Sequence, residues 1–279
     1  MSDKPLVQQA LATELANLLL AISDTRSSLH FLRGFWETMV RDWNGIDRLR
    51  CVLRDFICGM GIHGDDTSMD KYYMLVRRFI NASFRLLLRA DWDAAACTEY
   101  NSILSQTGGP LCPDDINVPA SLAFHICDIY FEELDKVLVD TPSSPCPLST
   151  IISPFFTLAA GTHAKLTYKH TQSTVLDPIL SALQSSHMNT GSGPMRKRAR
   201  LEPNFQHVLD NSCISDPKEG PVDHANLRRA LLRRIFDVAS EEGTRDSNRR
   251  KMYALFKAAK AEEDGDDSES DGDDSESDA

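Results

Sequence analysis

The sequence has no long apolar run and no close group of cysteines. The first absence argues against a membrane-spanning protein, and the second against a disulfide framework or a zinc site. The chain contains no stretch of about 18 uncharged apolar residues, which a membrane-spanning helix requires, so we expect no membrane partner. The opening residues, MSDKP, lack the basic and apolar regions of a signal peptide. The seven cysteines are scattered, and Cys112, His125 and Cys127 have the wrong spacing for zinc. We therefore expect reduced, buried thiols and no metal or other cofactor.

The end of the chain lacks basic residues altogether. Residues 262–279 contain 11 acidic side chains and no lysine or arginine, which leaves 30 acidic residues (41 minus 11) against 30 basic ones in the body. The formal net charge of −11 therefore belongs to the tail. The heptapeptide DGDDSES occurs there twice in succession, at 264–270 and 271–277. A segment this polar buries too little apolar surface to fold, so we predict a disordered acidic tail.

The body is rich in apolar residues spaced three and four apart, which is typical of amphipathic helices. This spacing predicts helices over residues 5–22, 29–43, 69–90, 93–106, 119–139, 149–160 and 173–187, and two more over 223–240 and 245–260. No segment alternates convincingly with a period of two. We therefore expect an all-α fold in which helix pairs form an α-solenoid of HEAT-like repeats.

Composition divides the chain into four parts. We expect a helical scaffold domain over 1–187 and a disordered linker, rich in Ser, Asn, Gly and Pro, over 188–221. A basic helical segment is expected over 222–261, before the acidic tail at 262–279.

Two motifs carry a family resemblance. RDWNGIDRLR (41–50) and MDKYYMLVRRF (69–79) resemble the signature of the nucleolar ribosomal RNA processing protein 1 family, and further similar segments are SDKPLVQQALATELANLL (2–19), FHICDIYFEELDKVL (124–138) and NRRKMYALFK (248–257). The resemblance implies a repeat-like helical scaffold without catalytic activity. It also implies a nuclear and nucleolar protein of pre-rRNA processing and ribosome assembly, in particular of the large subunit. The alternative is a nuclear α-solenoid adaptor between proteins, unrelated to ribosomes.

The chain departs from the family pattern in two places. In the family, GIDRLR runs almost directly into DKYYML, whereas residues 51–68 intervene here. The 18 extra codons are 54 nucleotides, a length that suits a short fungal-type intron retained in frame. The insert has G-x-G-x-x-G spacing at 59–64, but Asp65 and Asp66 follow where a pyrophosphate would lie, so we interpret it as a loop and not a dinucleotide site. The family also has helices before the segment that opens this chain, which predicts an N-terminal truncation.

A basic ridge is predicted on the helix over 69–90. Offsets of 7, 7 and 4 residues place four cations within about 40° of one another: Lys71, Arg78, Arg85 and Arg89. Another face of the same helix is expected to pack inward: Tyr72, Val76, Phe79, Ser83 and Leu86. Two interpretations of the ridge are open. It contacts rRNA phosphates or an acidic protein, or it is a solvated face with local salt bridges.

The signature residues Arg41, Trp43 and Arg48 are the next candidates. With Asp42 and Asp47 they place opposite charges around a tryptophan. We favour a structural role, in which ion pairs hold a helix–loop–helix junction, over a partner-binding surface. A catalytic pair of carboxylates is not expected, because no nucleophile with a positioned histidine accompanies them.

Two more basic clusters follow the scaffold domain. The first is predicted to be a nuclear import signal for an import receptor: Arg196, Lys197, Arg198 and Arg200. The second is predicted to contact the RNA backbone: Arg228, Arg229, Arg233, Arg234, Arg249, Arg250 and Lys251. The expected partners are thus the pre-ribosomal particle and an import receptor, without a small-molecule substrate.

Three serines of the acidic tail each precede an acidic residue by three positions, as acidophilic kinase sites do: Ser268, Ser270 and Ser275. Phosphorylation would add nearly two negative charges at each. The tail either covers the second basic cluster until rRNA displaces it or only increases solubility.

The intron hypothesis predicts that most transcripts lack the codons for residues 51–68. Sequencing the messenger RNA across this region measures this directly. An abundant message that contains these codons would show that the insert belongs to the protein.

Overall fold

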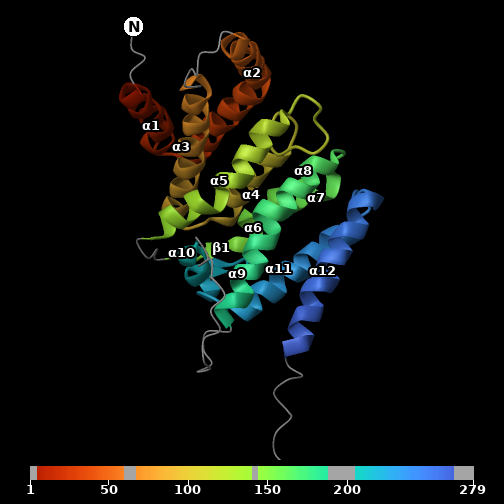
Figure 1. The fold of residues 1–279 in the computed structure, drawn as a ribbon. Helices are drawn as coiled ribbons and strands as arrows, with labels where there is room; N and C mark the ends of the chain where they lie inside the picture. The colour runs from red at the N-terminus through yellow and green to blue at the C-terminus, as the bar shows by residue number, and fades with distance from the viewer. Residues whose placement is uncertain (1–4, 60–66, 140–143, 188–204, 267–279) are drawn as a thin grey trace, which may run out of the picture.

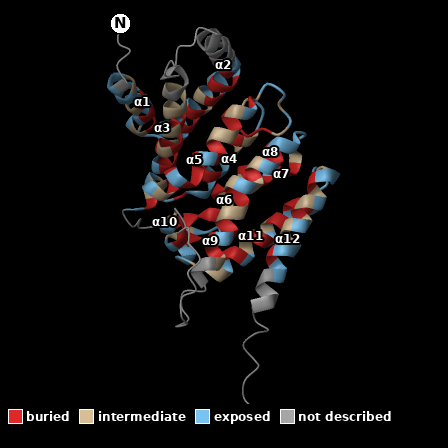
Figure 2. Ribbon diagram, viewed as in Figure 1, coloured by how far each residue is buried: buried red, intermediate tan, exposed pale blue. Residues whose placement is uncertain are grey.

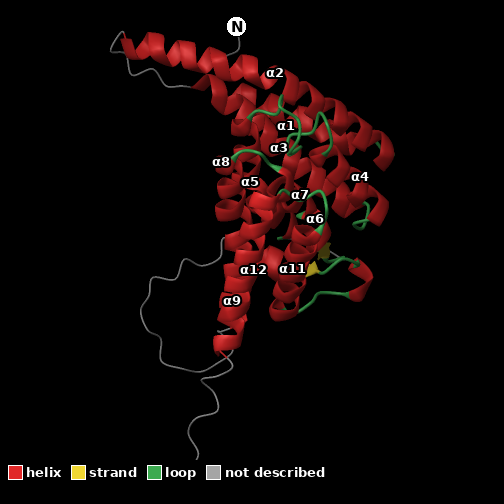
Figure 3. Cartoon of the chain, turned by 90° about the vertical axis from the view of Figure 1, so that its right-hand side faces the viewer, coloured by secondary structure: helices red, strands yellow, loops and turns green. Residues whose placement is uncertain are grey.

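In a computed structural model, helices make up nearly all of the regular structure (Figures 1 and 3). The structure describes residues 5–59, 67–139, 144–187 and 205–266. The helices are α1 (Pro5–Ala21), α2 (Thr25–Gly59), α3 (Thr67–Arg89), α4 (Ala94–Ser105), α5 (Ala120–Leu138), α6 (Leu148–Ile151), α7 (Ser153–Gly161), α8 (Lys165–Thr171), α9 (Asp177–His187), α10 (Gln206–Asp210), α11 (His224–Ser240) and α12 (Asp246–Asp266). A π-helical stretch, η1 (Gln172–Leu176), joins α8 to α9, and a 3-10 turn, η3 (Pro217–Glu219), precedes α11. The predicted all-α fold is confirmed.

The helices are stacked in approximate chain order, from α1–α3 at one end of the molecule to α11–α12 at the other (Figure 1). α1 packs along α3, α3 along α5, and α11 against both α9 and α12. Buried residues, red in Figure 2, lie on the inner faces of these helices. Their side chains form one core that extends from Ala16 to Ala259. The predicted boundary after residue 187 is therefore not a division of this core. None of the described helices is long and apolar enough to cross a membrane.

Two helices extend beyond their predicted ends. α2 continues through Gly45 to Gly59, although the sequence predicted an end at residue 43 and a loop over the insert. One glycine inside a helix costs only about 1 kcal/mol relative to alanine, and no atom lies close to the side-chain position of Gly45. α12 likewise continues to Asp266, inside the segment that was predicted to be disordered.

The predicted disordered linker is wrong for its described part, residues 205–221. This segment contains α10 and returns to the middle of the molecule, where β2 (Ser212–Cys213) pairs in parallel with β1 (Cys146–Pro147). Val208 and Leu209 are fully buried, and the Val208 backbone N–H donates to the Asp135 carboxylate at 3.0 Å. Its composition resembles that of a loop, but a few apolar residues suffice to dock it on α5.

Tyr130 of α5 joins three helices at the centre of the core. Its ring makes edge-on contacts with Phe84 of α3 and Phe155 of α7, with centroid distances of 4.9 and 4.6 Å. Its hydroxyl donates a 2.7 Å hydrogen bond to the backbone oxygen of Ile151 at the end of α6. Because all three rings are fully buried, their packing fixes how α3, α5 and α7 cross.

A buried carboxylate, that of Glu133, ties α3 to α5. Glu133 is only 2% exposed. One carboxylate oxygen accepts from Arg77 Nη1 at 3.0 Å and from Lys136 Nζ at 2.8 Å, and the other accepts from Asn81 Nδ2 at 3.1 Å. A buried charge is stable only when it is paired and hydrogen-bonded, and here both oxygens have partners.

Replacing Glu133 with alanine should reduce the free energy of unfolding by about 2–3 kcal/mol. A fully buried pair costs about 3–5 kcal/mol to break, and the loss is smaller here because Arg77 and Lys136 keep access to water. Urea unfolding followed by circular dichroism measures the change. The control is Glu99→Ala, which breaks the half-exposed Arg33–Glu99 pair and should cost at most about 1 kcal/mol. Equal losses in the two variants would show that the buried Glu133 network stabilises the fold no more than the Arg33–Glu99 pair does.

Candidate functional site

The predicted basic ridge lies on α3, but its four cations differ in what they do. Of the predicted inward face, Val76, Phe79, Ser83 and Leu86 are buried, and Tyr72 is partly buried against the core. The guanidinium of Arg89 binds the end of α1. It donates to the backbone oxygens of residues 20 and 22 at 2.7 and 3.0 Å. It thereby satisfies carbonyl groups at the end of α1 that no helical N–H can reach.

The other ridge residues stay on the surface. Arg85 makes a long, 3.4 Å hydrogen bond to the Asn17 side chain of α1, and the Lys71 ammonium lies 5.3 Å from the centre of the Tyr72 ring. Arg78 is exposed, and none of the residues that the structure describes forms an ion pair or hydrogen bond with it. Arg78 and Arg85 are therefore the ridge cations best placed to meet a partner.

The signature tryptophan is a core residue. Trp43 is fully buried, its indole Nε1 donates to the Ser121 hydroxyl of α5 at 3.0 Å, and its ring meets Tyr73 edge-on at 5.5 Å. Its side chain therefore packs inside the fold, as a structural role requires, and its role as a partner-binding residue stays a prediction. The side chains that it holds together come from α2, α3 and α5.

Arg41 and Asp42 do not hold a helix–loop–helix junction, because α2 is continuous there, and the side chains of Asp47 and Arg48 lie outside the described residues. Arg41 Nε donates to the Asp42 carboxylate at 2.8 Å, and this hydrogen bond lowers the pKa of Asp42. Both side chains are exposed, so the pair adds little stability. The side chain of Arg48 lies outside the described residues, and its role stays a prediction.

Three members of the second basic cluster are structural. Arg249 donates to the backbone oxygens of Ala239, Glu241 and Thr244 at 3.0–3.1 Å and so closes the end of α11. The ammonium of Lys251 lies 4.3 Å from the centre of the buried Tyr168 ring. The third is Arg228, which is buried between α11 and α12. These three cations contact other parts of the same fold and are therefore less available to a partner. The sequence alone did not show this.

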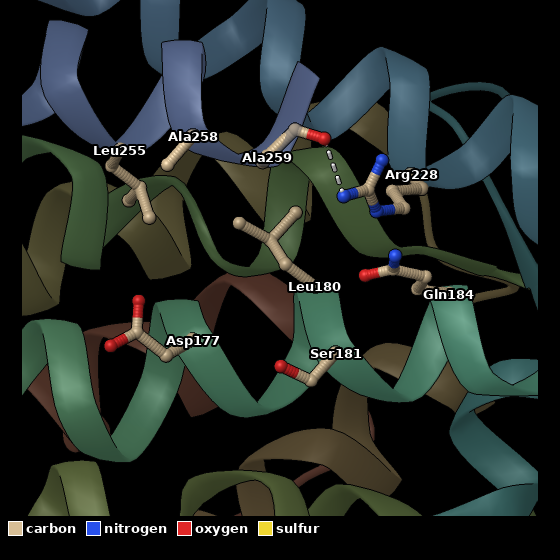
Figure 4. A pocket seen from close by; sticks show the side chains of 8 residues that line it. All are labelled: Asp177, Leu180, Ser181, Gln184, Arg228, Leu255, Ala258 and Ala259. Atoms are coloured by element: carbon tan, nitrogen blue, oxygen red, sulfur yellow. Dashed lines mark hydrogen bonds between the residues drawn. The ribbon is translucent and has the colours of Figure 1, made fainter. Parts of the chain in front are cut away.

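Arg228 lies beside a cavity of about 180 Å³ between α9, α11 and α12 (Figure 4). The side chain is 4% exposed and donates to the backbone oxygen of Ala259 at 2.8 Å. Asp177 and Ser181 of α9 line the opposite wall. Burial raises the pKa of Asp177, which is consistent with its position at the cavity edge. The cavity is a gap where the three helices meet, and beside it Arg228 joins α11 to α12.

The outer side of α11 and α12 keeps exposed cations. Arg229, Arg233 and Arg250 are exposed, and Arg234 lies 3.8 Å from the Glu241 carboxylate. Phe236, which was not among the residues expected at a site, is 42% exposed on the same helix as Arg233. The signal for it was available, because Arg229, Arg233 and Phe236 have the four- and three-residue spacing of one helix face.

The cysteines that the structure describes are free and buried, as predicted. Burial raises the pKa of Cys97 and that of Cys127 to about 12, so both stay protonated at neutral pH. His125 instead contacts the backbone oxygen of Tyr73 at 3.0 Å. Within the described part of the chain, no group of three His, Cys, Asp or Glu side chains is placed to hold a metal ion.

Several predicted sites lie outside the described residues. They are the import cluster Arg196, Lys197, Arg198 and Arg200, and the tail serines Ser268, Ser270 and Ser275. Their roles stay predictions.

The helical body as a whole matches a known family model. The model describes the nucleolar protein Nop52, and it matches residues 1–51 and 63–256. The chain belongs to the Nop52 family of nucleolar proteins. The match includes α1, the described part of α3 and everything from α4 to α11, so the family is defined by the same helices that share the core.

Curated relatives of this Nop52-family chain carry names that refer to ribosomal RNA. Human ribosomal RNA processing protein 1 homolog B is 28% identical over 88% of the chain, and the human homolog A is 25% identical over 92%. The homolog from Dictyostelium discoideum is 24% identical over 93% of the chain. The aligned parts span 28%, 58% and 49% of these three relatives, so the chain spans less than two thirds of their length.

The Nop52 match omits residues 52–62, which lie inside the predicted insert. The structure extends α2 over the first part of the insert, to Gly59, so that part is helix and not the expected loop. The retained intron itself stays a prediction.

Replacing Arg228 with alanine should lower the free energy of unfolding by about 1–3 kcal/mol, because it removes a buried hydrogen bond between α11 and α12. The matched control is Arg233→Ala on the exposed face of the same helix, which should change stability by at most about 0.5 kcal/mol. Thermal and urea unfolding of both variants measure the difference. Equal stability of the two variants would mean that Arg228 does not hold the helices together.

Proposed function

We propose that the chain is a non-enzymatic nucleolar ribosome-assembly factor that is required for pre-rRNA processing in large-subunit maturation. It acts as a helical scaffold on pre-ribosomal particles. The observation that carries the proposal is the Nop52 match, which covers residues 1–51 and 63–256 and so reaches from α1 into α12, over nearly all of the shared core. The names of the relatives point to the same process. The adaptor unrelated to ribosomes is not favoured by this membership.

A scaffold role agrees with how the described side chains are used. The aromatic and ionic contacts join helices to one another: Tyr130 joins α3, α5 and α7, and Glu133 joins α3 to α5. The exposed cations of the two predicted basic clusters that the structure describes lie on two separate helical surfaces, α3 and the pair α11–α12. Two basic surfaces on one rigid core can hold two phosphate-rich or acidic partners at a fixed separation.

Entry to the nucleus is part of the proposal. The cluster at 196–200 would bind an import receptor, and the tail serines would be substrates of an acidophilic kinase. Both depend on short, charged sequence motifs alone.

Charge reversal at Arg78 and Arg85 should weaken association with pre-ribosomal particles, because repulsion from phosphate replaces attraction at the exposed part of the ridge. The tagged full chain and the double glutamate variant are compared by sedimentation of nuclear extract and by sequencing of the RNA recovered with each. A loss of about tenfold or more from the particle fractions is expected.

The control carries the same change of charge elsewhere, Lys165→Glu with Lys169→Glu on the exposed side of α8. The single variant Arg78→Glu serves as a second test, since Arg85 also contacts Asn17 and its loss affects α1. Normal sedimentation of the double variant would show that the ridge is a solvated face that does not contact the particles. Recovery of the unmodified chain without rRNA precursors or ribosomal proteins would contradict the proposed function itself.

A further inference from the structure

The outer face of α11 and α12 carries a partly exposed aromatic cluster. Phe236 of α11 is 42% exposed, and its ring centre lies 5.3 Å from that of Tyr253 and 5.2 Å from that of Phe256, both on α12. The two helices run antiparallel, since Arg228 contacts Ala259 near one end and Arg249 contacts Ala239 near the other. The cluster therefore lies between these two contacts, nearer the Arg249–Ala239 end, with the Phe236 ring partly open to solvent.

Cations follow the same face on both helices. Arg233 and Arg229 precede Phe236 by three and seven positions, so they lie on one side of α11, and Lys260 follows Phe256 by four positions on α12. All three are exposed. Arg229 donates to the Asn226 side chain at 2.7 Å, whereas no described residue forms an ion pair or hydrogen bond with Arg233 or Lys260.

Acidic residues offset part of the charge of this face. Hydrogen bonds from Asn226 and the nearby charge of Arg229 lower the pKa of Asp223 at the start of α11. Asp237 follows Arg233 by four positions and so lies on the same side of α11, but the two side chains form no ion pair or hydrogen bond. Glu241 lies beyond the end of α11, where its carboxylate is 3.8 Å from Arg234. The face therefore combines an open ring with two exposed cations, Arg233 and Lys260, that form no ion pair with any described residue.

We propose that this face binds single-stranded RNA, with a base stacked on Phe236 and the adjoining phosphates held by Arg233, Arg229 and Lys260. The proposal rests on the proposed function, which supplies pre-rRNA as the natural ligand. Exposed aromatic rings beside arginine and lysine bind single strands because every base has a face that can stack. A duplex keeps its bases stacked inside and cannot offer one to Phe236.

An acidic polypeptide fits the face less well. It would satisfy the cations, but the acidic segment 262–279 has no apolar side chain larger than that of Ala279 with which to cover the ring. Charge alone therefore leaves Phe236 in water, whereas a nucleotide uses both the ring and the cations.

The test measures binding of the full chain to a labelled, unstructured RNA of about 12 nucleotides, within the site sizes typical of single-strand binding, by fluorescence anisotropy. Phe236→Ala should weaken binding about 5- to 100-fold, the range expected for the loss of one stacked base. Phe236→Tyr keeps the ring and should bind as the unmodified chain does. Arg233→Ala should also reduce the slope of log K against log salt by about 0.7, the value for one phosphate of a single strand.

The matched control for the apolar change is Leu166→Ala, which removes another exposed apolar side chain, on α8, and should leave binding unchanged. Phe236 is half exposed, and circular dichroism confirms that its variants keep their helix content. Equal affinity of the unmodified chain and Phe236→Ala, or equal binding of single strand and duplex, overturns the proposal. A synthetic peptide of residues 262–279 that binds more tightly than RNA, and needs Phe236 to do so, makes this a protein-docking face and overturns it too.

Sedimentation with pre-ribosomal particles separates this inference from the proposed function. If the chain enters the particles but its Phe236→Ala variant keeps full RNA affinity, the proposed function is supported and the RNA-stacking proposal is rejected. If the chain binds single strands through Phe236 but is absent from the particles, the RNA-stacking proposal is supported and the proposed function is rejected.

Discussion

The carboxylate of Glu133 is the point on which the arrangement of the first half of the molecule depends. It lies between α3 and α5, and it accepts hydrogen bonds from Arg77, Asn81 and Lys136. Few positions of α3 relative to α5 would give this buried carboxylate its hydrogen-bond partners. The carboxylate therefore specifies how far the two helices are shifted along each other, as well as that they are in contact. The offset then determines where Tyr130, one turn earlier on α5, meets Phe84.

Arginine serves two purposes in this chain, and geometry separates them. Arg89 and Arg249 reach the carbonyl groups at the ends of α1 and α11, which a helix leaves without internal partners. The planar guanidinium suits this use, because its several N–H groups can serve two or three carbonyls at once. Arg78 on α3 and Arg233 on α11 are instead exposed and keep their charge for a ligand. Basic content therefore overstates the charge that is available for binding.

Most helices could be predicted from the sequence, because apolar residues spaced three and four apart reveal a buried face wherever one exists. The inward face of α3, with Val76 and Phe79, followed from the same rule. The capping role of Arg89 could not be predicted, because its partners lie 67 and 69 residues away along the chain. The docking of residues 205–221 was missed for a related reason: its composition is that of a loop, and only the acceptor on α5 and strand β1 gives it a fixed place.

The return of the chain through β2 has a consequence for cooperativity. In an ideal solenoid each repeat contacts only its neighbours, and the array can melt from one end. Here β2 joins β1 and Val208 binds Asp135 before the chain continues to α11, which itself packs on α7 and α9. Late segments thus support early ones, and the loss of the last two helices removes contacts from the middle of the molecule. The chain is built to unfold as one unit, unlike a string of independent repeats.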